Sequence, residues 1–411
     1  MITEEMKLKY AKLLIRKGVN VQHDQPLVIN ASVRDADFVR LCVDEAYRAG
    51  AKSVTVNWAD EAIRKMSYEN ESIETLETVP QWLYDKMKYE QEEGACYLRI
   101  TSEKPGMYND VDPDKIIACQ SAYSAKMKDL RHYLMANEGQ WCIAGMPSYE
   151  WAEVVFPDIG REEAFAKLEE AIFAVGRVSD DNDPLKDWAN HDAELTEHAR
   201  KLNEYNFKEM YFRNGLGTDL TVGLVNDHVW AGGNGLTPGG VEFDPNIPTE
   251  EVFCMPHKDA VNGIVYASKP LSYNGKVIED FWFRFSEGKV VDFGAGKEAD
   301  TLRQLLDFDE GSRRLGEVAL VPYDSPVSHT GMLFFNTLYD ENAACHLALG
   351  ASYPENLKGG TDMGEEDLLA CGANQSMQHE DFMFGTEDME VDGICFDGRI
   401  VPVFRKGNFV I

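Results

Sequence analysis

The sequence lacks several patterns that mark common classes of protein. Its 411 residues contain no Cys-x-x-Cys pair, no His-Glu-x-x-His and no Gly-x-Gly-x-x-Gly. A zinc ribbon, a zincin protease and a dinucleotide-binding domain are therefore not indicated. The eight cysteines are scattered along the chain, which is typical of reduced thiols in a cytosolic protein rather than of a disulfide framework.

Basic charge is also scarce, since 40 Lys and Arg face 71 Asp and Glu, a formal net charge of −31. Nucleic acid and anionic membrane surfaces both require basic contacts, so neither partner is expected. No run of about 18 apolar residues occurs, so no membrane span is expected. The charged, amphipathic start MITEEMKLKYAKLLIRKG is not typical of a signal peptide. These features together predict a cytoplasmic protein.

The first half of the chain alternates strand and helix patterns. Strands predicted at 26–30 and 53–58 enclose a helix predicted at 35–49, and Gly50 closes that helix. Strand, helix and strand of these lengths predict a βαβ unit and hence a parallel sheet. Further strands are predicted at 96–101 and 140–145, and further helices at 113–136, 162–175 and 184–202.

From about Phe207 the pattern changes to hairpins. Turns at 274–275, 287–288 and 397–398 each contain glycine and separate strand-like runs, which predicts antiparallel structure. We therefore expect an α/β fold that is α+β overall. An N-terminal α/β scaffold domain with a parallel sheet is expected over residues 1–206. A C-terminal, largely antiparallel β domain with helices, carrying the functional site, is expected over residues 207–411.

Side chains that ligate metals concentrate between His346 and Asp381. This interval also holds Tyr353 and His379, and such a mixed nitrogen and oxygen set suits a divalent cation. In a strand, side chains two residues apart share a face, so His379 and Asp381 should point the same way and Glu380 the other way. The same tripeptide also fits a half-buried strand whose polar side chains face water, so it is not specific by itself.

Two more stretches supply carboxylates. NIPTEEVF contains Glu250 and Glu251, and GEVALVP, a predicted buried strand, starts with Glu317. A carboxylate that enters an apolar strand needs a cationic partner to offset its desolvation. Each glutamate alone is more typical of a solvated or capping residue than of a ligand. Combined with His346, His379 and Asp381, they give five ligands, a number that fits two metal ions better than one tetrahedral zinc.

The stretches NIPTEEVF, GEVALVP, NTLYDENAACHLALG and NQSMQHEDFMFG closely resemble the aminopeptidase T and aminopeptidase S family of dinuclear metallo-exopeptidases. The resemblance covers the whole chain. It implies two divalent metal ions, zinc or cobalt in the first place and manganese or magnesium as alternatives. It selects the second glutamate of NIPTEEVF, and the implied ligands are Glu251, Glu317, His346, His379 and Asp381.

The resemblance also implies an activity, which is hydrolysis of the N-terminal peptide bond of short peptides by a metal-activated water. Glu317 or Glu251 is then expected to accept the water proton, and Tyr353 to donate to the oxyanion. A homodimer, with the N-terminal domain taking part in dimerisation, is implied as well. A two-metal phosphoesterase and a catalytically silent metal- or peptide-binding protein remain alternatives. Polar neighbours expected to support the ligands are His329, Asp340, Glu341 and Asn342.

Overall fold

The computed structural model describes residues 2–273 and 276–411, which divide into two compact units. The first comprises residues 1–189 and 234–248, and the second residues 190–233 and 249–411. Helix α10 (Pro184–Tyr205) crosses this division. The division differs from the single boundary expected at Phe207, because the chain returns to the first unit with β10 (Asn246–Ile247), which pairs with β4 (Trp141–Gly145). A two-residue pairing leaves no periodic pattern in a sequence.

The first unit contains a five-stranded sheet in the order β10-β4-β3-β1-β2, and every pairing in it is parallel. Its central strand is β1 (Pro26–Ser32), in which Leu27 and Ile29 are fully buried. Parallel strands that helices cover are apolar on both faces. The parallel sheet and its buried central strand confirm the α/β class expected for this half. The other strands of this sheet are β2 (Ser53–Ala59) and β3 (Cys96–Thr101). Strands β8 (Gly235–Leu236) and β9 (Glu242–Phe243) form a separate two-stranded sheet.

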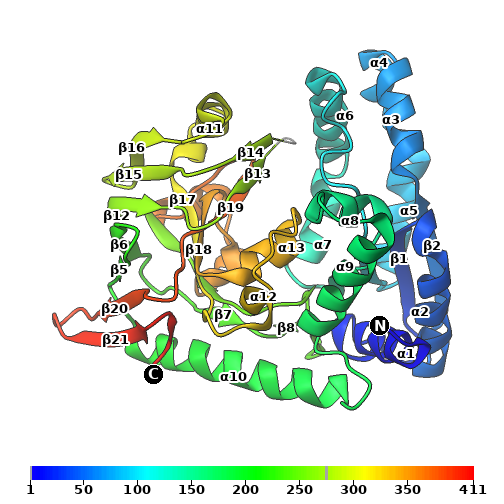
Figure 1. Cartoon of the computed structure of the whole chain (residues 1–411), viewed down its shortest axis with the longest axis horizontal. Coiled ribbons are helices and arrows are strands. Elements are labelled where there is room, and N and C mark those ends of the chain that lie inside the picture. The colour runs from blue at the N-terminus through cyan, green and yellow to red at the C-terminus, as the bar shows by residue number, and fades with distance from the viewer. Residues whose placement is uncertain (1, 274–275) are drawn as a thin grey trace. The chain divides into compact units, whose positions relative to one another are not determined.

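The helices predicted at 35–49 and 162–175 lie close to their expected positions, and the stretch predicted at 113–136 is divided into two helices; those over 61–92 and 149–155 were not predicted. Helix α2 (Ala36–Ala49) ends at Gly50, whose φ of 99° lies in the left-handed region that favours glycine. Helix α1 (Glu4–Leu13) continues into a π-helical turn that ends at Gly18. The others are α3 (Glu61–Asn70), α4 (Ile73–Leu76), α5 (Gln81–Glu92), α6 (Pro113–Lys126), α7 (His132–Met135), α8 (Tyr149–Val155) and α9 (Arg161–Val175) (Figure 1).

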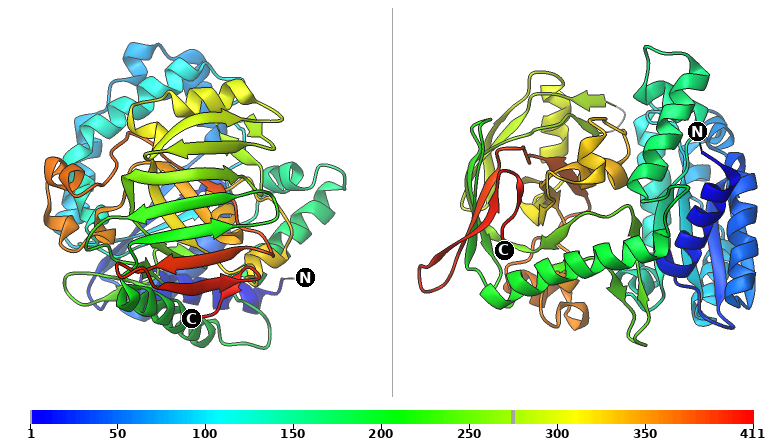
Figure 2. Two further views of the ribbon diagram at one scale, coloured as in Figure 1. Left: turned by 90° about the vertical axis from the view of Figure 1, so that its left-hand side faces the viewer. Right: turned by 60° about the horizontal axis from the view of Figure 1, so that its bottom comes forward.

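The second unit is built on two antiparallel sheets. The larger has eight strands in the order β16-β15-β12-β6-β5-β20-β21-β22, and Figure 2 (left) shows it face-on. The smaller has the order β19-β18-β17-β11-β7. The strands of the larger sheet are β5 (Glu209–Arg213), β6 (Asp219–Leu224), β12 (Pro256–Tyr266), β15 (Trp282–Ser286), β16 (Lys289–Gly294), β20 (Glu390–Ile394), β21 (Ile400–Arg405) and β22 (Asn408–Phe409). This architecture confirms the antiparallel character expected for the second half.

The smaller sheet and the connecting elements complete the second unit. Its strands are β7 (Ala231–Gly232), β11 (Val252–Cys254), β17 (Leu315–Leu320), β18 (His346–Gly350) and β19 (His379–Met383). Helices α11 (Ala299–Leu306), α12 (Pro326–His329), α13 (Thr337–Asp340) and α14 (Glu365–Ala370) lie between strands along the chain. Strands β13 (Leu271–Tyr273) and β14 (Lys276–Ile278) pair antiparallel, while the turn residues predicted at 274–275 lie outside the described residues.

One apolar core joins the two sheets of the second unit. Phe212 and Phe283 from the larger sheet belong to the same buried cluster as Val318, Leu347 and Phe382 from the smaller sheet. The rings of Phe283 and Phe382 lie 5.0 Å apart in an edge-to-face arrangement, a geometry that aromatic pairs prefer. One face of the smaller sheet is thereby fixed against the core, and its other face is left for polar side chains.

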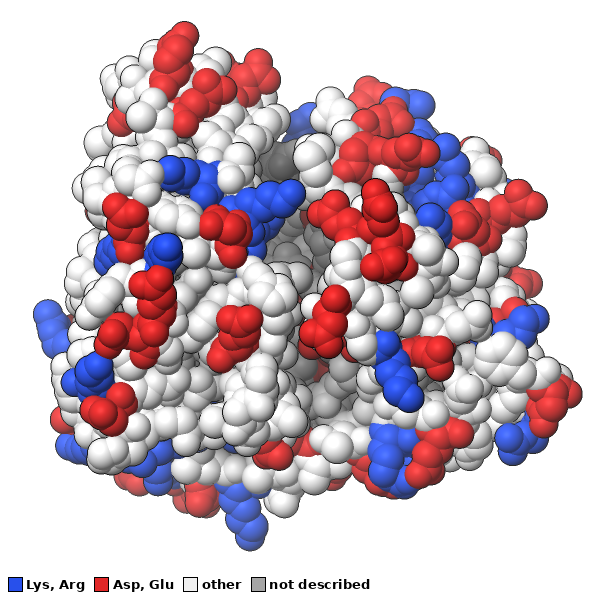
Figure 3. Space-filling view, turned by 180° about the vertical axis from the view of Figure 1, so that it is seen from behind, with Lys and Arg blue, Asp and Glu red and all other residues white. Residues whose placement is uncertain are grey.

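Charged side chains are spread over the surface of the molecule. Figure 3 shows acidic side chains across one face with basic side chains among them. Many are neighbours along a helix, such as Arg200 and Glu197, whose ion pair measures 2.7 Å. Exposed pairs of this kind contribute little to stability. Among residues 2–273 and 276–411, no helix is both long and apolar enough to cross a membrane.

Candidate metal centre

The polar face of the smaller sheet carries the predicted ligands. In the antiparallel register, Glu317 pairs with Ala348, Ala348 pairs with Asp381, and His346 pairs with Ala319. Directly paired residues share a face of a sheet, so these side chains lie on one side. The alternate residues of the same strands, such as Val318 and Leu347, lie in the core. Alternation therefore places the ligands opposite the core.

Small residues leave space above this face. Ala319, Ala348 and Gly350 occupy the positions between the larger side chains on β17 and β18. The pairing of β17 with β18 shifts between Leu315 and Glu317, which is a β-bulge. Bulges re-aim side chains and are common beside active sites. The bulge thus sets the direction of Glu317 relative to its neighbours on β18.

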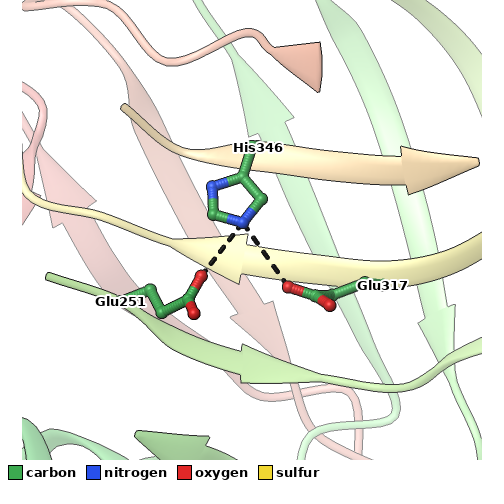
Figure 4. Close-up of side chains that lie close together, drawn as sticks. All are labelled: Glu251, Glu317 and His346. Atoms are coloured by element: carbon green, nitrogen blue, oxygen red, sulfur yellow. Dashed lines mark ion pairs between the residues drawn. The ribbon is translucent and has the colours of Figure 1, made fainter. Parts of the chain in front are cut away.

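A first group of candidate ligands contains Glu251, Glu317 and His346, and one ligand atom from each lies within 4.8 Å of the others. His346 Nε2 lies 3.0 Å from Glu251 Oε2 and 3.4 Å from Glu317 Oε1. Figure 4 shows both carboxylates directed at this nitrogen. Three stretches far apart in the sequence thus converge on one point.

A second group contains Glu317, His379 and Asp381, again with ligand atoms within 4.8 Å of one another. His379 Nε2 lies 3.4 Å from Glu317 Oε2 and 3.5 Å from Asp381 Oδ1. Glu317 therefore belongs to both groups, with one oxygen facing each imidazole. His379 and Asp381 meet on one face of β19, as strand alternation predicts, and Glu380 is absent from both groups.

Backbone hydrogen bonds fix the orientation of both imidazoles. His346 Nδ1 lies 3.2 Å from the carbonyl oxygen of Ala344, and His379 Nδ1 lies 2.7 Å from that of Ala351. A ring N–H that donates to a carbonyl leaves the opposite nitrogen free to ligate a metal. Nε2 of each ring therefore faces the carboxylates in the tautomer that a metal requires.

The arrangement fits a pair of divalent cations. Nitrogen and oxygen ligands lie about 2.0–2.2 Å from zinc, so two ligands of one ion cannot be more than roughly twice that distance apart. The distances from each imidazole nitrogen to its carboxylate oxygens, 3.0–3.5 Å, lie within this value. Glu251 Oε2 and Asp381 Oδ1 are buried, and among the described residues their close contacts are imidazole nitrogens, which are themselves metal-ligating atoms. A buried carboxylate oxygen needs a hydrogen-bond donor or a cation.

The pKa values of Glu251 and Glu317 are shifted in opposite directions. Burial raises the pKa of Glu251, and Glu317 and Asp381 raise it further, although His346 opposes them. Burial also acts to raise the pKa of Glu317, but the two imidazoles outweigh it and lower that pKa to about 2. Burial lowers the pKa of both His346 and His379, yet the surrounding carboxylates outweigh it and raise each pKa well above 6.5.

Tyr353 lies beside the second group. Its ring centroid is 4.7 Å from that of His379, and on its other side Phe253 packs edge-on at 6.1 Å. Burial and then the carboxylates of Glu317 and Asp381 raise the pKa of the Tyr353 phenol well above 10. The phenol therefore keeps its proton and can donate it.

The remaining candidates take different positions. Glu250 is buried and pairs with His191 at 3.4 Å, apart from the ligand groups. His329 is exposed and pairs with Asp324 at 2.9 Å. Asp340 accepts hydrogen bonds from the backbone of Phe334 and Asn336, and so shapes the loop before α13.

Asn342 supports the segment that carries the first ligand. Its side-chain oxygen accepts from the backbone nitrogen of Glu250 at 2.7 Å, and its amide nitrogen donates to Leu338 O at 2.8 Å. It thereby ties the residue before Glu251 to the end of α13.

Two more side chains lie at the centre: Glu341, which the sequence had indicated as a supporting residue, and Phe253, which sequence reasoning missed. Burial, followed by Asp381 and Glu251, raises the pKa of Glu341 well above 4.5, so this carboxylate faces the ligand groups. Phe253 lies two residues after Glu251 and pairs with Ala319, on the ligand face of the sheet. The two-residue spacing from Glu251 was the signal that could have identified Phe253.

Comparison with known proteins gives the class of enzyme. The chain is 45% identical over 400 residues to aminopeptidase AmpS of Bacillus subtilis, covering 97% of both chains. It is 42% identical over 403 residues to aminopeptidase T of Thermus aquaticus, covering 98% of both. The solved structure of AmpT from Thermus thermophilus matches with a TM-score of 0.93 and 39% identity, over 99% of this chain and 100% of that one. The protein is therefore a hydrolase of the exopeptidase class.

The family of the protein is identified by a match to a family model over nearly the whole chain. Residues 3–409 match the family described as thermophilic metalloprotease (M29), and the chain belongs to that family. This confirms the expected resemblance and the dependence on a divalent metal.

Proposed function

We propose that this protein is an aminopeptidase that hydrolyses the N-terminal peptide bond of short peptides at a two-metal centre. Its ligands are Glu251, Glu317, His346, His379 and Asp381. The observation that carries the proposal is the membership of Glu317 in both ligand groups, with Oε1 toward His346 and Oε2 toward His379. A carboxylate that presents one oxygen to each of two groups suits a ligand shared by two ions.

Divalent cations at such a centre polarise a carbonyl oxygen and lower the pKa of a water molecule toward neutrality. Zinc or cobalt is proposed first, with manganese and magnesium as alternatives, because nitrogen and oxygen ligands accept all four. The residues of the chain then have to hold the substrate, accept a proton and stabilise negative charge on the scissile carbonyl.

Glu251 and Glu317 are both proposed as proton acceptors, and in the metal-free protein their pKa values are shifted in opposite directions. Burial raises the pKa of Glu251, whereas the two imidazoles keep Glu317 anionic to low pH. A general base works best when its pKa approaches the working pH. Glu341, whose pKa is also raised by burial, is a further candidate for the same step. Turnover by Glu251→Gln and Glu341→Gln, each at full metal content, distinguishes them.

Tyr353 is proposed as the donor to the oxyanion. Its phenol keeps its proton because burial and the nearby carboxylates raise its pKa. Its ring is held between Phe253 and His379, which restricts its orientation. A fixed donor of this kind stabilises the charge that develops on the carbonyl oxygen.

The test uses four substrates and one chelator. The metal-loaded protein should release the N-terminal residue from a dipeptide and from an aminoacyl anilide, but not from the N-acetylated anilide. Removal of metal by a chelator should abolish turnover, and added zinc or cobalt should restore it. Hydrolysis of a chromogenic phosphoester in place of the peptides would favour a two-metal phosphoesterase, and binding without any turnover a silent binding protein.

We also propose a homodimer located in the cytoplasm, with the N-terminal domain contributing to dimerisation. The family resemblance supports the dimer. All eight cysteines are free in the structure, which supports a reducing compartment. Light scattering coupled to gel filtration tests the dimer, since a mass of one chain, 46.3 kDa, would contradict it.

A further inference from the structure

Glu355 is a carboxylate beside the candidate centre to which the two-metal mechanism gives no role. It lies in the short 3₁₀ turn Pro354–Asn356, directly after Tyr353, whose ring packs on His379. The turn is therefore attached at one end to a residue that contacts the second ligand group.

The other end of the turn is attached to the strand that follows Glu251, a member of the first ligand group. Asn356 is buried, and its side-chain amide donates to the carbonyl oxygens of Val229 at 3.1 Å and Phe253 at 3.3 Å. Phe253 is two residues from Glu251 on the same face of the sheet. Glu355 is thus held between two anchors, and each of them reaches a different ligand group.

The surroundings of Glu355 are short of positive charge. Its side chain is exposed and makes no ion pair or hydrogen bond with the described residues. Desolvation by the surrounding protein raises its pKa, and the carboxylates of Glu317 and Glu251 raise it further. The side chain is thus open to solvent and also within electrostatic range of the ligand carboxylates. A carboxylate placed there near two others, without a basic neighbour, is suited to a cationic ligand from outside the chain.

We propose that Glu355 binds the α-ammonium group of the peptide substrate and so selects chains with a free N-terminus. This inference rests on the proposed aminopeptidase function and adds to it the group that recognises the amine. A peptide α-amine has a pKa of about 7.7–8.0, so much of it is cationic near neutral pH, and it carries three N–H donors. The rings of Phe253 and Tyr353, 6.1 Å apart, provide an apolar surface for the adjoining side chain of the substrate.

Glu355 is not proposed as a metal ligand. Neither group of candidate ligands among the described residues includes it. Its substitution should therefore change recognition of the amine and leave the metal content intact, which separates this role from those of Glu251 and Glu317.

The experiment compares ligands with and without an amine. Calorimetry on the metal-loaded protein measures binding of L-leucinol and of 4-methylpentan-1-ol, which has the same carbon chain without the amine. Glu355→Gln should weaken leucinol binding about tenfold to hundredfold, the range for hydrogen bonds to charged groups, and leave the other alcohol unchanged. Glu355→Asp should recover part of the loss. Glu366→Gln, at an exposed carboxylate of α14, is the matched control and should bind both like the parent.

Kinetics give an independent measurement on the same variants. With an aminoacyl anilide, Glu355→Gln should raise KM by a similar factor, with kcat and bound metal unchanged. The inference is wrong if Glu355→Gln keeps the parent preference for leucinol over the other alcohol. It is also wrong if the variant binds both alcohols more weakly by the same factor, or if it loses its metal. A parent protein that binds leucinol but hydrolyses no peptide would instead contradict the proposed function, and the calorimetry would still decide the role of Glu355.

Discussion

Replacing Glu317 by glutamine removes a carboxylate that faces both imidazoles of the candidate centre. Each of its oxygens lies 3.4 Å from a different Nε2. If Glu317 is a ligand of both cations, Glu317→Gln should lose both metal ions, whereas Glu251→Gln and Asp381→Asn should each weaken mainly one. Loss even of a residue that only supports a ligand costs about 10- to 100-fold in metal affinity, so a shared ligand should cost at least that much at both positions.

The same substitution has a predictable effect on the protein stripped of metal. The pKa of Glu317 is lowered from 4.5 to about 2, a difference of 4.5 − 2, or about 2.5 units, which corresponds to about 3 kcal/mol. Because the pKa is lower in the folded state, this stabilisation is fully present above the unfolded pKa and is lost as the pH falls through about 2. Glu317→Gln should therefore lower the free energy of unfolding by about 3 kcal/mol at pH 7, and by less below pH 4.5.

The assay is metal analysis after dialysis, combined with urea unfolding of the chelator-treated proteins at pH 7 and pH 4. Glu380→Gln is the matched control, since Glu380 lies on the same strand but outside both ligand groups. It should keep both metal ions. A Glu317→Gln protein that retains two ions with the affinity of the parent would refute the shared ligand, and loss of a single ion would assign Glu317 to one position only.

Three further predictions test other parts of the structure. Tyr353→Phe should lower kcat about 10²- to 10³-fold with unchanged metal content, and parent-like turnover would exclude the oxyanion role. Because the pKa values of His346 and His379 are raised well above 6.5, metal binding at pH 7 should release protons and strengthen as the pH rises; calorimetry in buffers of different ionisation enthalpy measures this, and zero release would contradict it. Phe382→Ala should cost about 3–5 kcal/mol in urea unfolding, against no change for the exposed Met377→Ala; equal stabilities would show that the core between the sheets is not as described.

Local patterns in the sequence were sufficient for several helices, strands and hairpins. Gly50 marks the end of α2 because a left-handed residue is needed there. The hairpin that joins β15 to β16 follows from the Glu287–Gly288 turn, where both residues have positive φ. The alternation of His379 and Asp381 on one face is likewise a property of any strand. Each of these features depends on residues close together in the chain.

The metal centre could be predicted only in part. The residue types, and the resemblance to a known family, indicated which five side chains to consider. They did not show that Glu317 belongs to both groups, because this depends on the pairing of β17 with β18 and on the bulge beside Glu317. The position of Glu355 near Glu251 and Glu317 was also invisible, since it depends on the hydrogen bond from Asn356 to Phe253, 103 residues away.

The sequence by itself determined the elements, the alternation of faces and the identities of the candidate ligands, because these depend on short-range periodicity and on residue chemistry. Only the tertiary structure decided which oxygen faces which imidazole, and which strand returns to the first sheet. Those properties follow from strand register and long-range pairing. Because register depends on packing across the whole sheet, no local stretch of sequence specifies it.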